Sequence, residues 1–181
     1  QNYQAQLSPE PIAGWFDYME SHGTHKATGL YVTEVVGVKK FSPIPRGCAH
    51  SYLCHYVGRF DRPRSEIIWA KYKTHFLKDT FIGTGFREYP EDFKYRWTPD
   101  SGPILLGLGA AATGIGINAA STLDDPDTFK AIEKLLNRAD SGFGGIEKIV
   151  GNNLITRVAT DFLATSIRLS AETKSVWFQG R

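Results

Sequence analysis

The chain has 181 residues, with 21 basic and 19 acidic side chains and a formal net charge of +2 at pH 7. Hydrophobic residues make up 41% and charged residues 22%, which is typical of a globular chain and not of a disordered one. The near balance of charges gives no argument for nucleic acid or for an anionic membrane as a partner, and no nucleic-acid partner is predicted. The length fits one domain over residues 1–181, and because the chain starts at Gln1 we interpret it as part of a larger protein or assembly.

Helix signals begin close to the N-terminus. Ser8-Pro9-Glu10 combines a hydroxyl cap, a proline and an acid, and predicts a helix that runs to about Ser21. Residues 28–36 are rich in β-branched side chains and follow a glycine turn, so they predict a short extended segment or hairpin. A second helix opens at Pro45-Arg46-Gly47, and Asp61 is a candidate cap for a third. Their short polar connection predicts an antiparallel pair.

Residues 79–103 contain several glycines and prolines and therefore cannot continue a helix. Their many aromatic residues predict an ordered, packed loop. The small and apolar run from Ile104 to Ala120 then predicts a buried helix capped by Asp100 or Ser101. A membrane span is disfavoured, because the run is shorter than about 20 residues and holds several glycines.

Two more helices complete the expected fold. One begins at Asp124-Asp125-Pro126-Asp127, a turn follows at residues 141–145, and the last helix covers about residues 153–171. The sequence thus predicts a mainly α chain of about six helices, paired as antiparallel hairpins with long ordered loops between them.

The two cysteines, Cys48 and Cys54, are predicted to be free thiols. On one helix their Cα atoms would lie about 9 Å apart, beyond the disulfide limit of about 7 Å. Together with His50 and His55 they are the nearest approach to a zinc site, but they fall on different helix faces. No nucleotide-binding fingerprint is present, so no cofactor is predicted. Cys48 is either a buried core thiol or a reactive group near a helix N-terminus.

Several short segments carry a family resemblance: residues 28–31, 45–51 (Pro-Arg-Gly-Cys-Ala-His-Ser), 69–73, 85–90 (Gly-Phe-Arg-Glu-Tyr-Pro), 100–103 (Asp-Ser-Gly-Pro) and 110–114. Together they resemble the (α/α)-toroid domains of the linalool dehydratase/isomerase-like and six-hairpin glycosidase-like group, mostly uncharacterised bacterial proteins. The resemblance implies part of a toroid in a periplasmic or other extracytoplasmic location. Because 181 residues are too few for six hairpins, it also implies that further segments or a protein partner complete the toroid.

In such a fold, the loops at one end of the inner helices form a cleft. This arrangement would bring Arg46, Arg87, Glu88 and Asp100 together near helix N-termini, which favour anions. Glu88 and Asp100 are then candidates for a general acid/base pair. The alternative is structural: Arg87 and Glu88 form an ion pair, and Asp100 caps a helix.

The remaining candidates bind substrate. Arg46 or Arg87 would position an anionic or hydroxylated group, and Tyr89 and Trp97 would line the cleft. His50 is interpreted as a partly buried structural residue and not as a catalytic base.

Three functions follow from these features, and the sequence alone does not decide whether the chain is an enzyme. The first is a carbohydrate-active hydrolase or lyase that acts on a saccharide with a carboxylate pair. The second is a hydro-lyase or isomerase of a small apolar alcohol, with Cys48 or a tyrosine facing a closed pocket. The third is a non-catalytic helical scaffold of a membrane-associated assembly, with an apolar surface left for a partner.

Overall fold

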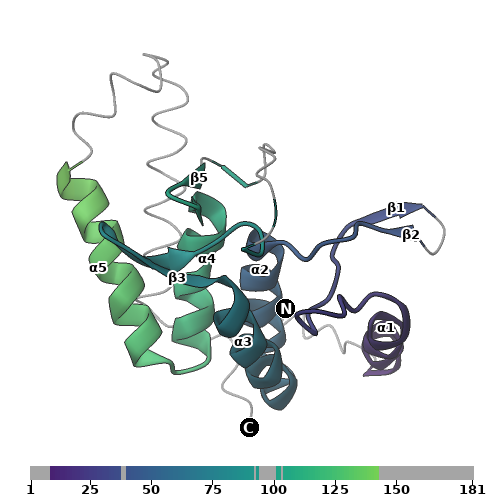
Figure 1. Ribbon diagram of the computed structural model, residues 1–181. Coiled ribbons are helices and arrows are strands. Elements are labelled where there is room, and N and C mark those ends of the chain that lie inside the picture. The colour runs from purple at the N-terminus through teal and green to yellow at the C-terminus, as the bar shows by residue number, and fades with distance from the viewer. Residues whose placement is uncertain (1–8, 38–39, 92, 94–100, 103, 143–181) are drawn as a thin grey trace, which may run out of the picture. The chain divides into compact units, whose positions relative to one another are not determined.

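The computed structural model describes residues 9–37, 40–91, 93, 101–102 and 104–142. This part of the chain is mainly helical, with five helices and three small antiparallel strand pairs, so the predicted helical class is confirmed (Figure 1). The toroid stays a prediction. The chain divides into two compact units, residues 1–45 and 46–181, and each is described by itself.

The first unit consists of one helix and a short hairpin. Helix α1 (Pro9–His22) ends close to the predicted boundary, and its residues Phe16 and Met19 are buried. The ring of Phe16 lies 6.1 Å from that of Tyr31, between the centroids. Strands β1 (Val35–Gly37) and β2 (Lys40–Phe41) then pair antiparallel, so this hairpin begins at the end of the segment expected to be extended, residues 28–36, and lies mostly beyond it.

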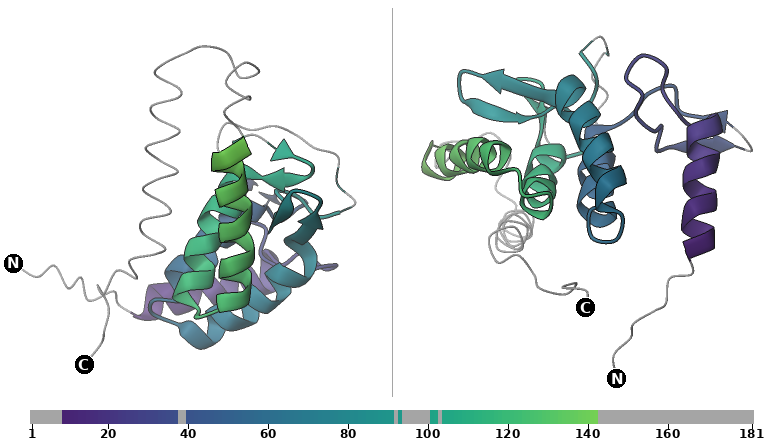
Figure 2. Two further views of the ribbon diagram at one scale, coloured as in Figure 1. Left: turned by 90° about the vertical axis from the view of Figure 1, so that its left-hand side faces the viewer. Right: turned by 90° about the horizontal axis from the view of Figure 1, so that it is seen from below.

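The second unit contains four helices, α2 (Gly47–Val57), α3 (Arg62–Phe76), α4 (Ala110–Thr122) and α5 (Pro126–Gly142). Helix α4 packs between α2 and α5, and α3 packs against α2 (Figures 1 and 2). The sequences of α2 and α4 contain no Asp, Glu, Lys or Arg, whereas α3 and α5 carry charged residues on their exposed sides. This contrast makes α2 and α4 the inner helices of the unit. No helix in the described ranges has the length and apolar character needed to cross a membrane.

A hairpin follows α3 directly, where the sequence predicted a loop. Strand β3 (Leu77–Thr80) pairs antiparallel with β4 (Gly83–Phe86). A Cβ atom on Gly83 or Gly85 would come within 3.0 Å of Leu135, so these glycines let α5 approach the hairpin closely. Phe86 is fully buried, and its ring stacks on Tyr72 of α3 with 4.4 Å between the centroids.

A second correction concerns the start of α4. Residues 104–109 are not helical but form β5 (Ile104–Leu105) and β6 (Leu108–Gly109), joined by Leu106 and Gly107 with φ of 54° and 86°. Positive φ at both central residues is the geometry of a two-residue hairpin turn. The N-cap position of α4 is Gly109 and not Ser101, although the Ser101 carbonyl accepts from Ala111 N in the first turn at 3.2 Å; Asp100 lies outside the described residues.

The start of α5 lies where the sequence places it. The Asp125 carboxylate accepts hydrogen bonds from Thr128 N at 3.1 Å and, on α3, from Trp69 Nε1 at 2.9 Å and Lys73 Nζ at 2.6 Å. Burial would raise the pKa of Asp125, but the bonds from Lys73, Trp69 and Thr128 together lower it to about 2. Asp125 therefore caps α5 and also fastens it to α3.

Candidate functional site

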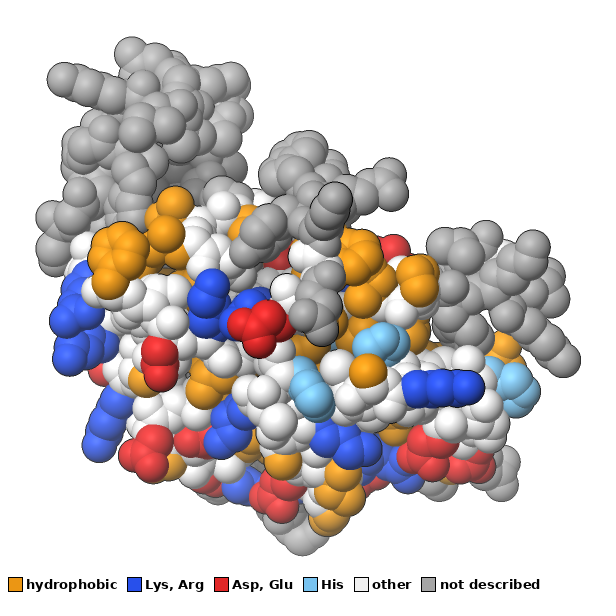
Figure 3. All heavy atoms as spheres, viewed as in Figure 1, with side chains coloured by type: hydrophobic (Ala, Val, Ile, Leu, Met, Phe, Trp, Pro, Cys, Tyr) orange, Lys and Arg blue, Asp and Glu red, His pale blue; other side chains and the backbone are white. Residues whose placement is uncertain are grey.

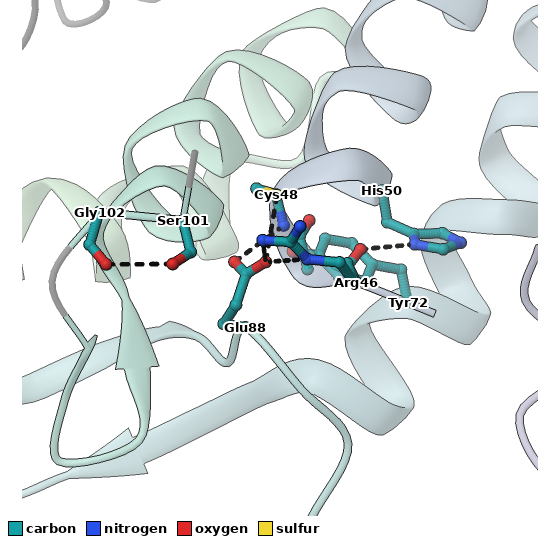
Figure 4. Close-up of polar contacts among 8 residues, drawn as sticks. Arg46, Cys48, His50, Tyr72, Glu88, Ser101 and Gly102 are labelled. Atoms are coloured by element: carbon teal, nitrogen blue, oxygen red, sulfur yellow. Dashed lines mark hydrogen bonds and ion pairs between the residues drawn. The ribbon is translucent and has the colours of Figure 1, made fainter. Parts of the chain in front are cut away.

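The centre of the candidate site is a buried ion pair between Arg46 and Glu88 (Figure 4). Arg46 precedes α2 and is 6% exposed, and Glu88 follows β4 and has no exposed surface. The Nε and Nη2 atoms of Arg46 both lie 2.9 Å from Oε1 of Glu88. The fold thus joins two residues that are far apart in sequence and neutralises a carboxylate that could not otherwise stay charged inside the protein.

Glu88 also caps helix α2 from a distance. Its main-chain carbonyl accepts from Gly47 N at 2.8 Å, and its Oε2 accepts from Cys48 N at 3.2 Å. Arg46, in the N-cap position, makes no side-chain cap bond of its own. Two otherwise unpaired N–H groups of the first turn are therefore satisfied by one residue of another element, and the positive end of the helix favours the carboxylate.

The thiol of Cys48 completes the contacts of Glu88. Its Sγ lies 3.1 Å from Oε1, so within the described part of the chain Oε1 accepts from three donors and Oε2 from one. Burial raises the pKa of Glu88, although the bonds from Cys48 and the charge of Arg46 oppose the rise. Since each oxygen has two lone pairs, Oε2 is the atom with capacity left for a proton.

Aromatic and imidazole rings pack behind this pair. His50 is fully buried; its Nδ1 lies 2.8 Å from the Arg46 carbonyl, and its ring stacks on Tyr72 with centroids 5.6 Å apart. Burial lowers the pKa of His50 to about 4, against the effect of the Arg46 bond, so the ring is neutral near pH 7. The Tyr72 hydroxyl donates to Gly47 O at 2.9 Å, which ties α3 to the first turn of α2.

The other predicted residues divide between the site and its surroundings. Tyr89 is buried, and the guanidinium carbon of Arg46 lies 5.8 Å from the centre of its ring. The Arg87 side chain instead bonds Glu91 at 2.8 Å, so the alternative of an Arg87–Glu88 ion pair is wrong. Trp97 and Asp100 lie outside the described residues.

Sequence reasoning does not find one partner of Glu88. The sequence marks Cys48 as a core thiol or a reactive group near a helix N-terminus, but nothing in the pattern pairs it with Glu88. Both cysteines are free, as predicted. The described residues contain no group of three or more His, Cys, Asp or Glu side chains that could hold a metal ion.

Comparison of the chain with protein-family models, curated proteins and solved structures finds no match. The toroid resemblance therefore stays a prediction from the sequence, and a function has to be argued from the site itself.

Proposed function

We propose that this chain carries the acid–base site of an enzyme that breaks a C–O bond, with Glu88 as the proton-transfer group. The observation that supports this proposal is a carboxyl group with no exposed surface that contacts both a guanidinium and a thiol at the N-terminus of an inner helix. Burial raises the pKa of a carboxyl group, and a nearby fixed positive charge lowers it. Groups whose pKa is set by two such opposing influences are frequent at sites of proton transfer.

The two enzyme classes expected from the sequence share their first step. Both glycoside hydrolysis and alcohol dehydration begin when an acid protonates the oxygen that leaves carbon. Burial keeps the proton on Glu88 to a higher pH than on an exposed glutamate, which suits the acid form. When the proton has moved to the leaving oxygen, Arg46 and the first turn of α2 stabilise the remaining carboxylate.

Turnover by the Glu88→Gln variant tests the proposal. Purified protein is assayed against two sets of compounds, oligosaccharides and small apolar alcohols, and product formation identifies the substrate class. We expect kcat to fall by about 10²–10⁴-fold in this variant, because an amide cannot donate the proton. The matched control is Glu66→Gln, since Glu66 is half-exposed on α3 and pairs with Arg62; its kcat should stay within about twofold of the parent.

The proposal is wrong if correctly folded Glu88→Gln protein keeps the parent rate, or if the parent turns over neither set of compounds. Once a substrate is known, Asp100→Asn tests whether a second carboxyl group takes part. Equal loss in the two carboxyl variants would support the predicted pair.

One observation favours a second candidate, a non-catalytic module that binds a protein partner. Tyr52 and Tyr56 of α2 are 48% and 53% exposed, and their rings stack with 6.1 Å between the centroids. Ala49 and Leu53 are half-buried on the same stripe of the helix. Helix α2 carries no charged side chain, and a partner that covers this face would bury its exposed aromatic rings.

This second candidate predicts that the chain without its partner self-associates through the α2 face, the stripe of Ala49, Tyr52, Leu53 and Tyr56. We expect the parent to bind a hydrophobic dye and to associate as its concentration rises, and the Tyr52→Glu/Tyr56→Glu variant to do neither. Dye fluorescence and light scattering measure the two effects, with circular dichroism as the check on folding. If the parent and the variant bind the dye equally and have the same molar mass at high concentration, the α2 face is not a binding surface. Figure 3 shows the view of Figure 1 with all heavy atoms: charged side chains are spread over the described surface, with hydrophobic side chains among them.

A further inference from the structure

The imidazole of His50 makes one described hydrogen bond, and it goes to the Arg46 carbonyl. A carbonyl oxygen only accepts, so the proton is on Nδ1, 2.8 Å from that oxygen. The main-chain N of His50 also donates to it, at 3.2 Å. The other ring nitrogen, Nε2, is buried and has no hydrogen-bond partner among the residues that the structure describes. The polar role of this side chain is therefore to hold Arg46.

A histidine at this position lowers the stability of the fold, so its presence calls for an explanation. A buried polar atom without a partner costs about 1–3 kcal/mol, and Nε2 is such an atom. The ring stacks on Tyr72 and Phe76 with centroids 5.6 and 6.2 Å away, contacts that a phenyl ring would make equally well. Stacking thus does not explain the imidazole, whereas the bond from Nδ1 does.

The peptide group between Arg46 and Gly47 is fixed at both of its polar atoms. Its oxygen accepts from His50, and its N–H, which belongs to Gly47, donates to the main-chain carbonyl of Glu88 at 2.8 Å. Arg46 adopts an extended conformation with φ of −115° and ψ of 142° immediately before α2. The orientation of this peptide group sets the direction in which the Arg46 side chain leaves the backbone, and thus whether its guanidinium meets Oε1 of Glu88.

We propose that His50 is a positioning residue for the site: by holding the Arg46–Gly47 peptide, it aligns the guanidinium of Arg46 with the Glu88 carboxylate. This inference rests on the proposed function only for its effect on turnover. The geometry of the Arg46–Glu88 pair that it explains does not depend on whether the protein is an enzyme.

Three substitutions of His50 separate positioning from packing. In His50→Asn the amide nitrogen occupies the place of Nδ1 and keeps the bond, in His50→Gln it reaches instead toward the place of Nε2, and in His50→Phe only stacking remains. The readout is the pKa of Glu88, followed by NMR of its carboxyl carbon. We expect a further rise of this pKa in His50→Phe and His50→Gln, because a displaced Arg46 stabilises the carboxylate less, and no change in His50→Asn.

Among the described residues, the charged and titratable groups that act on Glu88 are Arg46, Cys48 and Tyr72, and they are the same in all these proteins. His50 is neutral above its pKa of about 4, so its own charge does not affect the comparison near pH 7. Phe76→Leu is the control, since it removes a stacking ring and leaves the Nδ1 bond; it should not move the Glu88 pKa. For an active enzyme, kcat should fall by about tenfold in His50→Phe and recover in His50→Asn.

The inference is overturned if folded His50→Phe protein has the parent's Glu88 pKa, or if His50→Asn shifts this pKa as much as His50→Phe. A Glu88 pKa that moves as expected in a protein without turnover would support the positioning role and contradict the proposed function. The two ideas therefore fail by different measurements.

Discussion

Replacing Arg46 by methionine is expected to lower the free energy of unfolding by about 3–5 kcal/mol at pH 7. Methionine keeps much of the apolar stem of the side chain but removes the guanidinium, and Glu88, with no exposed surface, becomes a buried charge without its ion-pair partner. Urea denaturation measures the effect, and we expect a lower midpoint with an unchanged slope.

The control is Arg87→Met, which removes a guanidinium close to the same site. Arg87 pairs with Glu91, whose side chain is 78% exposed, and exposed pairs contribute about 0–1 kcal/mol. Equal decreases in the free energy of unfolding of Arg46→Met and Arg87→Met would show that the buried Arg46–Glu88 pair contributes no more to stability than the exposed pair does. The double variant Arg46→Met/Glu88→Gln should recover part of the loss, because it no longer buries an unpaired charge.

The cost of Arg46→Met should also depend on pH. The pKa of Glu88 is raised by burial in the folded protein, so the folded state holds this proton more tightly than the unfolded state. Its contribution to stability is complete below the ordinary glutamate pKa and is lost as pH rises through the raised one. Without Arg46 the pKa rises further, so the difference between variant and parent should be small in acid and grow toward neutral pH.

Helix starts were predictable where the signal lies in a few neighbouring residues. Asp61 accepts from Arg64 N at 3.2 Å and caps α3, and Asp125 does the same for α5 through Thr128. Such caps depend on local chain geometry, and tertiary packing does not have to be known to find them. The starts of α3 and α5 were predictable for this reason, whereas the cap of α2 comes from Glu88, which is far away in the sequence.

The two hairpins were missed because their signals are not local. The β3–β4 strands are short and contain glycines and polar residues, and their position depends on contacts such as that of Gly85 with Leu135 on α5. In the run from Ile104 the turn places a leucine, Leu106, at positive φ, which is uncommon for any residue but glycine or asparagine. A continuous apolar run has no period that separates a hairpin from a buried helix.

At the site, too, features with a local signal were predictable and those set by tertiary contacts were not. Arg46 and Glu88 were both expected near helix N-termini, but the structural alternative paired Glu88 with Arg87, its neighbour in sequence. In an extended segment successive side chains point to opposite sides, so Arg87 turns to Glu91 while Glu88 turns to Arg46. The role of His50 was not visible either, because a histidine among core aromatics has the same sequence pattern whether or not its Nδ1 binds a carbonyl.

Replacing Gly47 by alanine is expected to cost about 3 kcal/mol or more and to disturb the site directly. A Cβ atom on Gly47 would overlap the carbonyl oxygen of Arg87 and would come within 3.0 Å of Ala112 Cβ. The obstacle is backbone, and it cannot easily move, because Arg87 N is bonded to Phe76 O at 2.8 Å. The first turn of α2 would have to shift away from Glu88, which holds Gly47 N and Cys48 N.

Gly114→Ala in α4 is the matched control for this substitution. Both changes add one methyl group to a helical glycine, but a Cβ on Gly114 meets nothing within 4 Å. We therefore expect Gly114→Ala to raise stability by about 0.5–1 kcal/mol, the usual preference of a helix for alanine. Thermal and urea denaturation of the two variants measure the contrast. If Gly47→Ala is as stable as Gly114→Ala, α2 does not approach the Arg87–Glu88 segment as closely as the site requires. The arrangement of Arg46, Cys48 and Glu88 would then be wrong, and the acid–base function argued from it would lose its support.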